Sequence, residues 1–188
     1  MKKVTNQIAA LCAAAAGALM LASASPALAK NPMVGGAPMY PSRNIIQNAV
    51  HSKDHTTLVA AVKAAGLVGT LEGKGPFTVF APTNEAFARL PKGTVASLLK
   101  PENKGKLTSI LTYHVIPGRL TARDLEMKVK AGHGHAMIKT VEGEDLTFTD
   151  QGRTLYVTDA KGDRARVTIP NVMQSNGVIH VINRVMLP

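Results

Sequence analysis

The chain has no tryptophan and only three tyrosines and four phenylalanines among its 188 residues. Aromatic side chains are the platforms on which many proteins stack exposed nucleic-acid bases. Their scarcity argues against a nucleic-acid partner, and it argues equally against a lectin that stacks on sugar rings.

Cysteine is almost absent too. Cys12 is the one cysteine, and it lies inside an apolar run at 8–22. Leu11 precedes it, where a lipoprotein signal requires a small residue, so we expect no lipid anchor. Beyond residue 12 the chain offers no thiol for a disulfide or for nucleophilic catalysis. The mature fold must therefore be held by its core alone.

The apolar run at 8–22 indicates export. Lys2 and Lys3 precede it, and residues 27–29 (Ala-Leu-Ala) follow as a small-x-small cleavage site. This pattern is typical of a secretory signal peptide, here over 1–29. The run is short and rich in alanine for a membrane span, although an uncleaved anchor is the alternative. We expect a secreted protein, located in the periplasm or outside the cell.

Acidic residues are few: 12 Asp and Glu stand against 22 Lys and Arg, for a net charge of +10. Residues 89–130 hold nine basic and three acidic residues, the basic ones including Lys104, Lys106, Arg119 and Arg123. Such a field attracts an acidic cell-surface protein, an anionic envelope or matrix polysaccharide, or a membrane through electrostatic surface contact. The alternative is a solvated face that maintains solubility.

Familiar catalytic and metal-binding patterns are missing as well. The sequence has no Gly-x-Ser-x-Gly elbow, no His-Glu-x-x-His helix and no phosphate-binding glycine loop. We therefore predict no enzyme and no cofactor. His133 and His135 are spaced for one face of a strand, and His51 and His55 for one face of a helix. Neither pair is joined by a cysteine or by a nearby pair of carboxylates, so they are candidate ligands for which we predict no physiological metal.

Two stretches carry the most specific structural pattern. Residues 77–81 (Phe-Thr-Val-Phe-Ala) form a short apolar strand that Pro82 ends, and Thr83 then caps a helix. Residues 176–188 begin with the turn signal Asn-Gly and continue as an expected strand that is apolar on both faces. One face carries Ile179, Val181, Val185 and Leu187, and the other carries Val178, His180, Ile182 and Met186. Such a strand belongs in the middle of a sheet or between two layers.

The remaining pattern is helical in the first half of the chain and extended in the second. Residues 54–65 place apolar side chains on one helical face, and Gly66 follows as a C-terminal stop. Residues 166–169 form an expected strand that Pro170 ends. Helices followed by closely spaced strands indicate the α+β class. Residues 30–43, rich in proline and glycine, are expected to be a flexible leader outside the core.

Three segments resemble the signature parts of the fasciclin-like (FAS1) domain family. Residues 77–87 resemble its first signature box, residues 176–188 its second, and residues 111–118 (Leu-Thr-Tyr-His-Val-Ile-Pro-Gly) its Tyr-His motif. They occur in the family's order, and the chain is similar to the bacterial secreted single-domain type over 44–188. The resemblance implies a FAS1 fold, a small two-sheet β-sandwich or wedge with several short helices packed on it.

The resemblance also implies an adhesion role for the Tyr-His motif. Tyr113 and His114 are therefore candidate partner-binding residues; the alternative is that His114 hydrogen-bonds backbone groups and fixes a helix-to-strand corner. Asn171, Val172 and Met173 form a second candidate segment, where animal FAS1 proteins that bind integrins carry an Asp. The neutral amide of Asn171 departs from that pattern and argues against integrin-type adhesion.

We therefore predict a cell-adhesion or surface-interaction module that binds without turnover. The contacts are the Tyr-His motif and residues 171–173, with the basic residues of 89–130 supplying charge, and we expect a monomer. Two alternatives remain open. One is a periplasmic carrier of a small apolar or aromatic molecule or a metal, with a cleft near His133 and His135. The other is an enzyme whose residue set the sequence does not identify.

Overall fold

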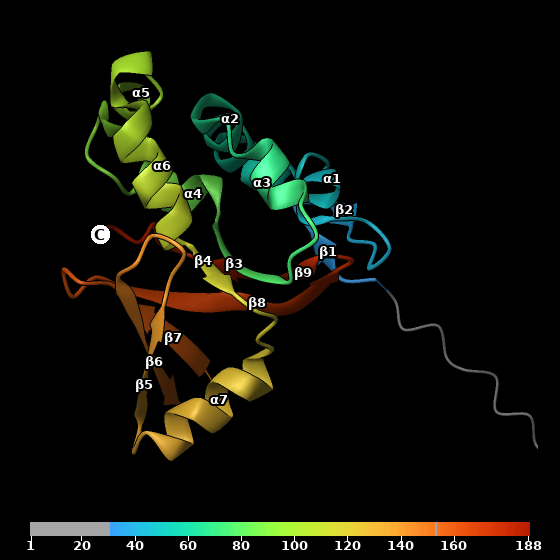
Figure 1. Cartoon of the computed structure of the whole chain (residues 1–188), viewed down its shortest axis with the longest axis vertical. Coiled ribbons are helices and arrows are strands. Elements are labelled where there is room, and N and C mark those ends of the chain that lie inside the picture. The colour runs from blue at the N-terminus through green and yellow to red at the C-terminus, as the bar shows by residue number, and fades with distance from the viewer. Residues whose placement is uncertain (1–30, 153) are drawn as a thin grey trace, which may run out of the picture. The chain divides into compact units, whose positions relative to one another are not determined.

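The structure is a computed structural model that describes residues 31–152 and 154–188, so the predicted signal peptide at 1–29 lies outside the described residues. In the described part a run of short helices precedes most of the strands, and this confirms the α+β class (Figure 1). None of the helices described is long and apolar enough to cross a membrane.

The elements follow one another along the chain in this order. The helices are α1 (Ile45–Ala49), α2 (Thr56–Ala65), α3 (Val68–Glu72), α4 (Asn84–Ala88), α5 (Thr94–Leu98), α6 (Lys104–Tyr113) and α7 (Ala122–Ala131), with 3₁₀ turns at Lys53–His55 and Pro101–Asn103. The strands are β1 (Met33–Val34), β2 (Ala37–Pro38), β3 (Phe77–Pro82), β4 (Val115–Pro117), β5 (His135–Lys139), β6 (Asp145–Gln151), β7 (Thr154–Thr158), β8 (Arg164–Gln174) and β9 (Gly177–Ile182). β1 and β2 form a hairpin, and the others form a seven-stranded sheet in the order β4-β3-β9-β8-β7-β6-β5.

Strands β3 and β9 run parallel at the centre of the first half of this sheet, whereas the other neighbouring strands are antiparallel. Phe77 pairs with Gly177 at the start of both strands. A Cβ atom on Gly177 would lie 2.1 Å from the carbonyl oxygen of Phe77, so only glycine lets the two backbones approach this closely.

Strand β9 lies between two apolar cores, as its two apolar faces predicted. Ile179 and Val181 belong to the core beneath helices α1–α6. Ile182 and Met186 belong to a second core that also contains residues of α7, which lies across the sheet from α1–α6 (Figure 1). The strand ends at Ile182 and not at residue 188 as predicted, yet Met186 is fully buried beyond it. The predicted division of the two faces therefore holds past the end of the strand.

Strand β8 is longer than predicted, because it continues through Pro170 to Gln174. Its register with β9 shifts between Val167 and Ile169 and again between Ile169 and Val172. Proline has no N–H to donate, and it is tolerated where bulges interrupt the ladder. The first residues of β8 pair with β7 and the rest with β9. The predicted two layers are therefore the two halves of one continuous sheet, β4-β3-β9-β8 and β8-β7-β6-β5, which β8 joins.

The predicted flexible leader at 30–43 is wrong for residues 31–43. The β1–β2 hairpin packs Val34 and Met39 into the first core, at 4% and 2% exposed. The Gly35 carbonyl accepts a hydrogen bond from the N–H of Lys53 at 3.2 Å. Glycine and proline here build a tight hairpin, which their composition alone does not distinguish from a flexible linker.

Substitution of Met39 tests this placement. We expect Met39→Ala to lower the free energy of unfolding by about 2–5 kcal/mol, because it removes buried methylene groups and leaves a cavity. Met33 in the same hairpin is 51% exposed, so Met33→Ala should change the free energy by less than about 0.5 kcal/mol. Urea denaturation measures both, and equal small effects would contradict a packed hairpin.

Candidate functional site

Tyr113 and His114 form the corner between α6 and β4, and they are 0% and 2% exposed. The Tyr113 hydroxyl donates to the carbonyl of Asp145 at 3.2 Å and accepts from the N–H of Ala160 at 3.1 Å. Burial raises the pKa of Tyr113, so the phenol stays protonated. The ring thus ties α6 to β6 and to the turn after β7.

Both nitrogens of His114 are occupied by backbone groups. Nε2 accepts a hydrogen bond from the N–H of Met186 at 3.0 Å, so the proton lies on Nδ1, which donates to the carbonyl of Ile110 at 2.7 Å. Burial lowers the pKa of His114 to about 4, and the ring is neutral at pH 7. The prediction of Tyr113 and His114 as surface contacts is therefore corrected, and the alternative of a corner fixed by His114 is what the structure contains.

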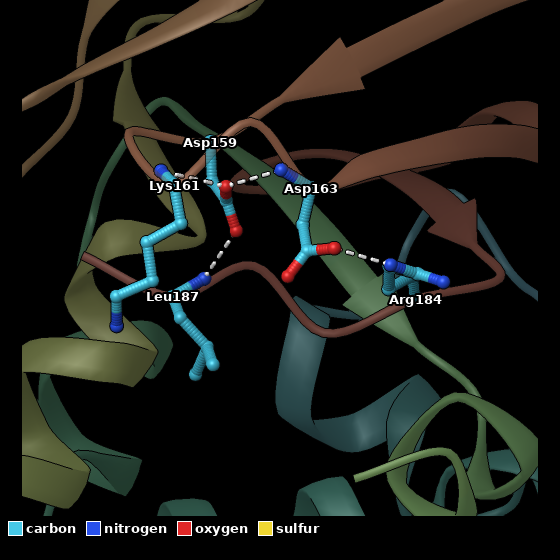
Figure 2. A network of polar contacts seen from close by, with 5 residues as sticks. All are labelled: Asp159, Lys161, Asp163, Arg184 and Leu187. Atoms are coloured by element: carbon cyan, nitrogen blue, oxygen red, sulfur yellow. Dashed lines mark hydrogen bonds and ion pairs between the residues drawn. The ribbon is translucent and has the colours of Figure 1, made fainter.

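A buried carboxylate holds the same C-terminal segment (Figure 2). One oxygen of Asp159 accepts from the N–H groups of Lys161 and Asp163 at 3.0 and 2.8 Å, and the other accepts from the N–H of Leu187 at 2.9 Å. Asp163 in turn forms an ion pair with Arg184. Asp159 was not predicted from the sequence, although an Asp that precedes Gly and Asp in a turn favours hydrogen bonds from the backbone to its side chain.

The four predicted basic residues are exposed but fall into two groups. Lys104 and Lys106 lie in the first turn of α6, whereas Arg119 precedes α7 and Arg123 lies in its first turn. Helix α6 spans ten residues, about 15 Å; the lysines lie in its first turn, and the arginines follow its other end, after β4. The positive charge of residues 89–130 is therefore not a single patch.

Asn171 joins the arginine group to the sheet. Its backbone is left-handed, with φ +58°, at the irregular part of β8. Its side-chain oxygen accepts the N–H of Ala122 at 2.7 Å, at the first residue of α7. Nearby, the Arg119 guanidinium donates to the carbonyls of Gln174 and Ser175 at 3.3 and 3.2 Å. The segment between β4 and α7 is thus held against the second half of β8.

We name the resulting region the β8 surface and define it as Arg119, Arg123, Asn171 and Met173. Asn171 and the two arginines are exposed, and Met173 is half-buried. Val172, which was predicted with them, is 1% exposed and packs in the first core. Its prediction as a contact is wrong, because alternate residues of a strand point to opposite faces.

A groove adjoins the β8 surface. It has a volume of about 360 Å³ and lies between α7 and strands β7 and β8, with Ala122, Glu126, Arg166 and Pro170 on its walls. Arg166 was not predicted as a site residue, because an exposed arginine that alternates with buried residues along a strand does not by itself indicate a binding site. The groove adds a third arginine to this side of the molecule.

The histidine pairs do not form a metal site. His133 and His135 are exposed at the turn between α7 and β5, and in 31–152 and 154–188 no three His, Cys, Asp or Glu side chains are grouped closely enough to hold a metal ion. His51 is exposed whereas His55 is buried, so that pair does not share a face.

The buried histidines predict how stability depends on pH. His114 is neutral in the folded state down to a pKa of about 4, but in the unfolded chain it takes up a proton near pH 6.5. The unfolded state then binds more protons between these values, so stability is complete above about pH 6.5 and falls as the pH decreases toward 4. The shift corresponds to about 3 kcal/mol, and burial lowers the pKa of His55 and His180 in the same direction. Urea denaturation from pH 7.5 to 4, with nitrogen NMR titration of His114, measures this; titration of folded His114 near 6.5 would contradict it.

Known proteins resemble this chain in sequence and in fold. A fasciclin domain family model matches residues 53–188. The chain is 48% identical over 159 residues to protein sll1483 of Synechocystis sp., across 85% of this chain and 81% of that protein. It is 34% identical over 207 residues to immunogenic protein MPB70 of Mycobacterium bovis, across 99% and 98%. It is also 38% identical over 132 residues to transforming growth factor-beta-induced protein ig-h3 of Sus scrofa, across 70% of this chain and 17% of that protein.

A solved structure agrees in fold. The FAS1 domain pair of the insect cell adhesion molecule Fasciclin I superposes with a TM-score of 0.69 at 18% identity, over 78% of this chain and 51% of that one. The family match covers most of the described residues and includes both signature segments and the Tyr-His motif. The chain therefore belongs to the fasciclin (FAS1) domain family.

Proposed function

We propose that this protein is an exported FAS1 module that binds an acidic partner at the cell surface, without turnover, through the β8 surface. The observation that carries the proposal is the contact of Asn171 with the N–H of Ala122, which joins the exposed arginines to the irregular part of β8. The solved FAS1 pair that this fold resembles comes from a cell adhesion molecule.

The Tyr-His motif is not part of the proposed contact, because both of its side chains are buried. Tyr113 and His114 hydrogen-bond to protein groups inside the fold, so the motif supports the surface only by fixing the corner from which β4 leads to Arg119. The partner contacts remain with the exposed residues of the β8 surface and with Arg166 in the adjoining groove.

The chemistry of these residues favours carboxylate or sulfate groups. A guanidinium presents several N–H donors in a plane that matches such anions, and it keeps its charge at any physiological pH. Asn171 offers a neutral amide whose oxygen already accepts from Ala122. It therefore does not bridge to a metal-dependent receptor, which requires a free carboxylate.

Binding to cell-envelope material at low and high salt tests the proposal. We expect saturable binding that weakens as salt screens the exposed ion pairs but is not abolished at about 0.5 M, where the general attraction between surface charges is screened. The double substitution Arg119→Gln and Arg123→Gln should weaken it roughly 2- to 30-fold, because it removes two exposed ion pairs that contribute about 0.2–1 kcal/mol each.

The matched control is Lys104→Gln with Lys106→Gln, which removes the same charge at the other end of α6. Equal weakening by both double variants would mean that the protein binds through general attraction by its net charge. That result would overturn the proposal that the β8 surface is the binding site. Protease and glycosidase treatment of the envelope material then separates an acidic surface protein from an anionic polysaccharide as the partner.

A further inference from the structure

An apolar cavity lies between the helices and strands β3 and β9, on the inner side of the sheet from the exposed β8 surface. It has a volume of about 40 Å³, and its walls come from the β1–β2 hairpin, α1, α2, β3 and β9. Leu58, Val62, Val79 and Ile179 are among the side chains that line it. Its walls are therefore formed by the first core, with few polar groups.

One polar atom on this wall has no partner. His55 is 3% exposed, and its Nδ1 lies 2.8 Å from the Ser52 hydroxyl. Its Nε2 is buried and forms no hydrogen bond within the described residues. The Ala81 backbone raises the pKa of His55 against the larger lowering effect of burial, but no hydrogen bond of normal geometry joins it to Nε2.

The other polar side chains on the wall are already paired. Ser52 is engaged with His55, and both nitrogens of His114 are bonded to the backbone. A buried polar atom without a partner typically costs about 1–3 kcal/mol, so Nε2 of His55 is a group that a ligand could satisfy.

Water does not suit this site well. A buried water molecule needs two to four polar partners, and the cavity offers Nε2 of His55 in a wall that is otherwise almost wholly apolar. The apolar part of a small ligand would pack against the rest of the wall, while one oxygen atom of the ligand would form a hydrogen bond with Nε2. A hydroxyl serves whichever nitrogen carries the proton, because it both donates and accepts.

We infer that this cavity is an internal binding site for a small, mainly apolar molecule with one hydroxyl or carbonyl group, which pairs with Nε2 of His55. The volume is roughly a quarter of the 150 Å³ of an engineered cavity that binds benzene, so the site accepts only a few heavy atoms in this conformation. Val34 and Met39 of the β1–β2 hairpin form part of the wall, so a longer ligand requires the hairpin to shift outward. The site is independent of the β8 surface.

Nuclear magnetic resonance on the unmodified full chain tests the inference with two probes. Xenon should cause saturable shifts of the methyl groups of Val62, Val79 and Ile179 and leave the His55 nitrogens almost unchanged. 1-Propanol should shift the same methyl groups and also Nε2 of His55. The nitrogens of His114, which lines the same cavity, provide the internal control and should not respond, because both are occupied.

The substitution His55→Leu separates the hydrogen bond from the apolar contact. It keeps a buried side chain of similar size, so we expect xenon to bind as before and the Kd for 1-propanol to rise about fivefold, the value of one hydrogen bond. An unchanged Kd for 1-propanol in this variant would overturn the role of Nε2. The absence of saturable shifts with either probe in the unmodified chain would overturn the site itself, without bearing on the partner proposed for the β8 surface.

Discussion

The parallel pairing of β3 with β9 is the constraint on which the rest of this structure depends. The two strands lie side by side at the centre of the β4-β3-β9-β8 half of the sheet and are covered on both faces, by α1–α6 on one side and by α7 on the other. Strands in this position are largely apolar, with Thr78 and His180 as buried polar exceptions, and Gly177 permits the close approach of the two backbones beside Phe77. The apolar residues of the two family signature boxes therefore follow from burial before any function is considered.

The Tyr-His motif serves the same constraint. Beyond β9 the chain leaves the sheet while it is still buried, so its N–H groups lose their ladder partners and need others. His114 supplies one for Met186 and Asp159 supplies one for Leu187. Tyr113 secures the turn in which Asp159 lies through the N–H of Ala160. The chain has no cysteine beyond residue 12 and so no disulfide that could hold this segment. Hydrogen bonds from side chains fix it in one conformation instead.

The sequence predicted the structural features that depend on the local spacing of residues. It did not predict those for which the same residue pattern is compatible with two different structures. The buried face of α2 and its end at Gly66 were predictable, because spacing along a helix and a left-handed glycine are local properties. Burial of Met39 was not, because proline and glycine mark tight hairpins and loose linkers alike. The end predicted at Pro170 was wrong, because a bulge depends on the partner strand. The contact of Asn171 with Ala122 joins residues 49 apart, and it leaves no trace in either segment.

The same pairing of β3 with β9 governs how the molecule folds. Phe77 pairs with Gly177, which lies 100 residues later in the sequence, and His114 accepts a hydrogen bond from Met186, 72 residues later. Neither core can close until these distant segments meet, because the entropy of closing a long loop is lost before the contact forms. The short helices of the first half therefore have no complete sheet to pack on until β9 is in place, and folding is slower than in a chain whose core is built from local contacts.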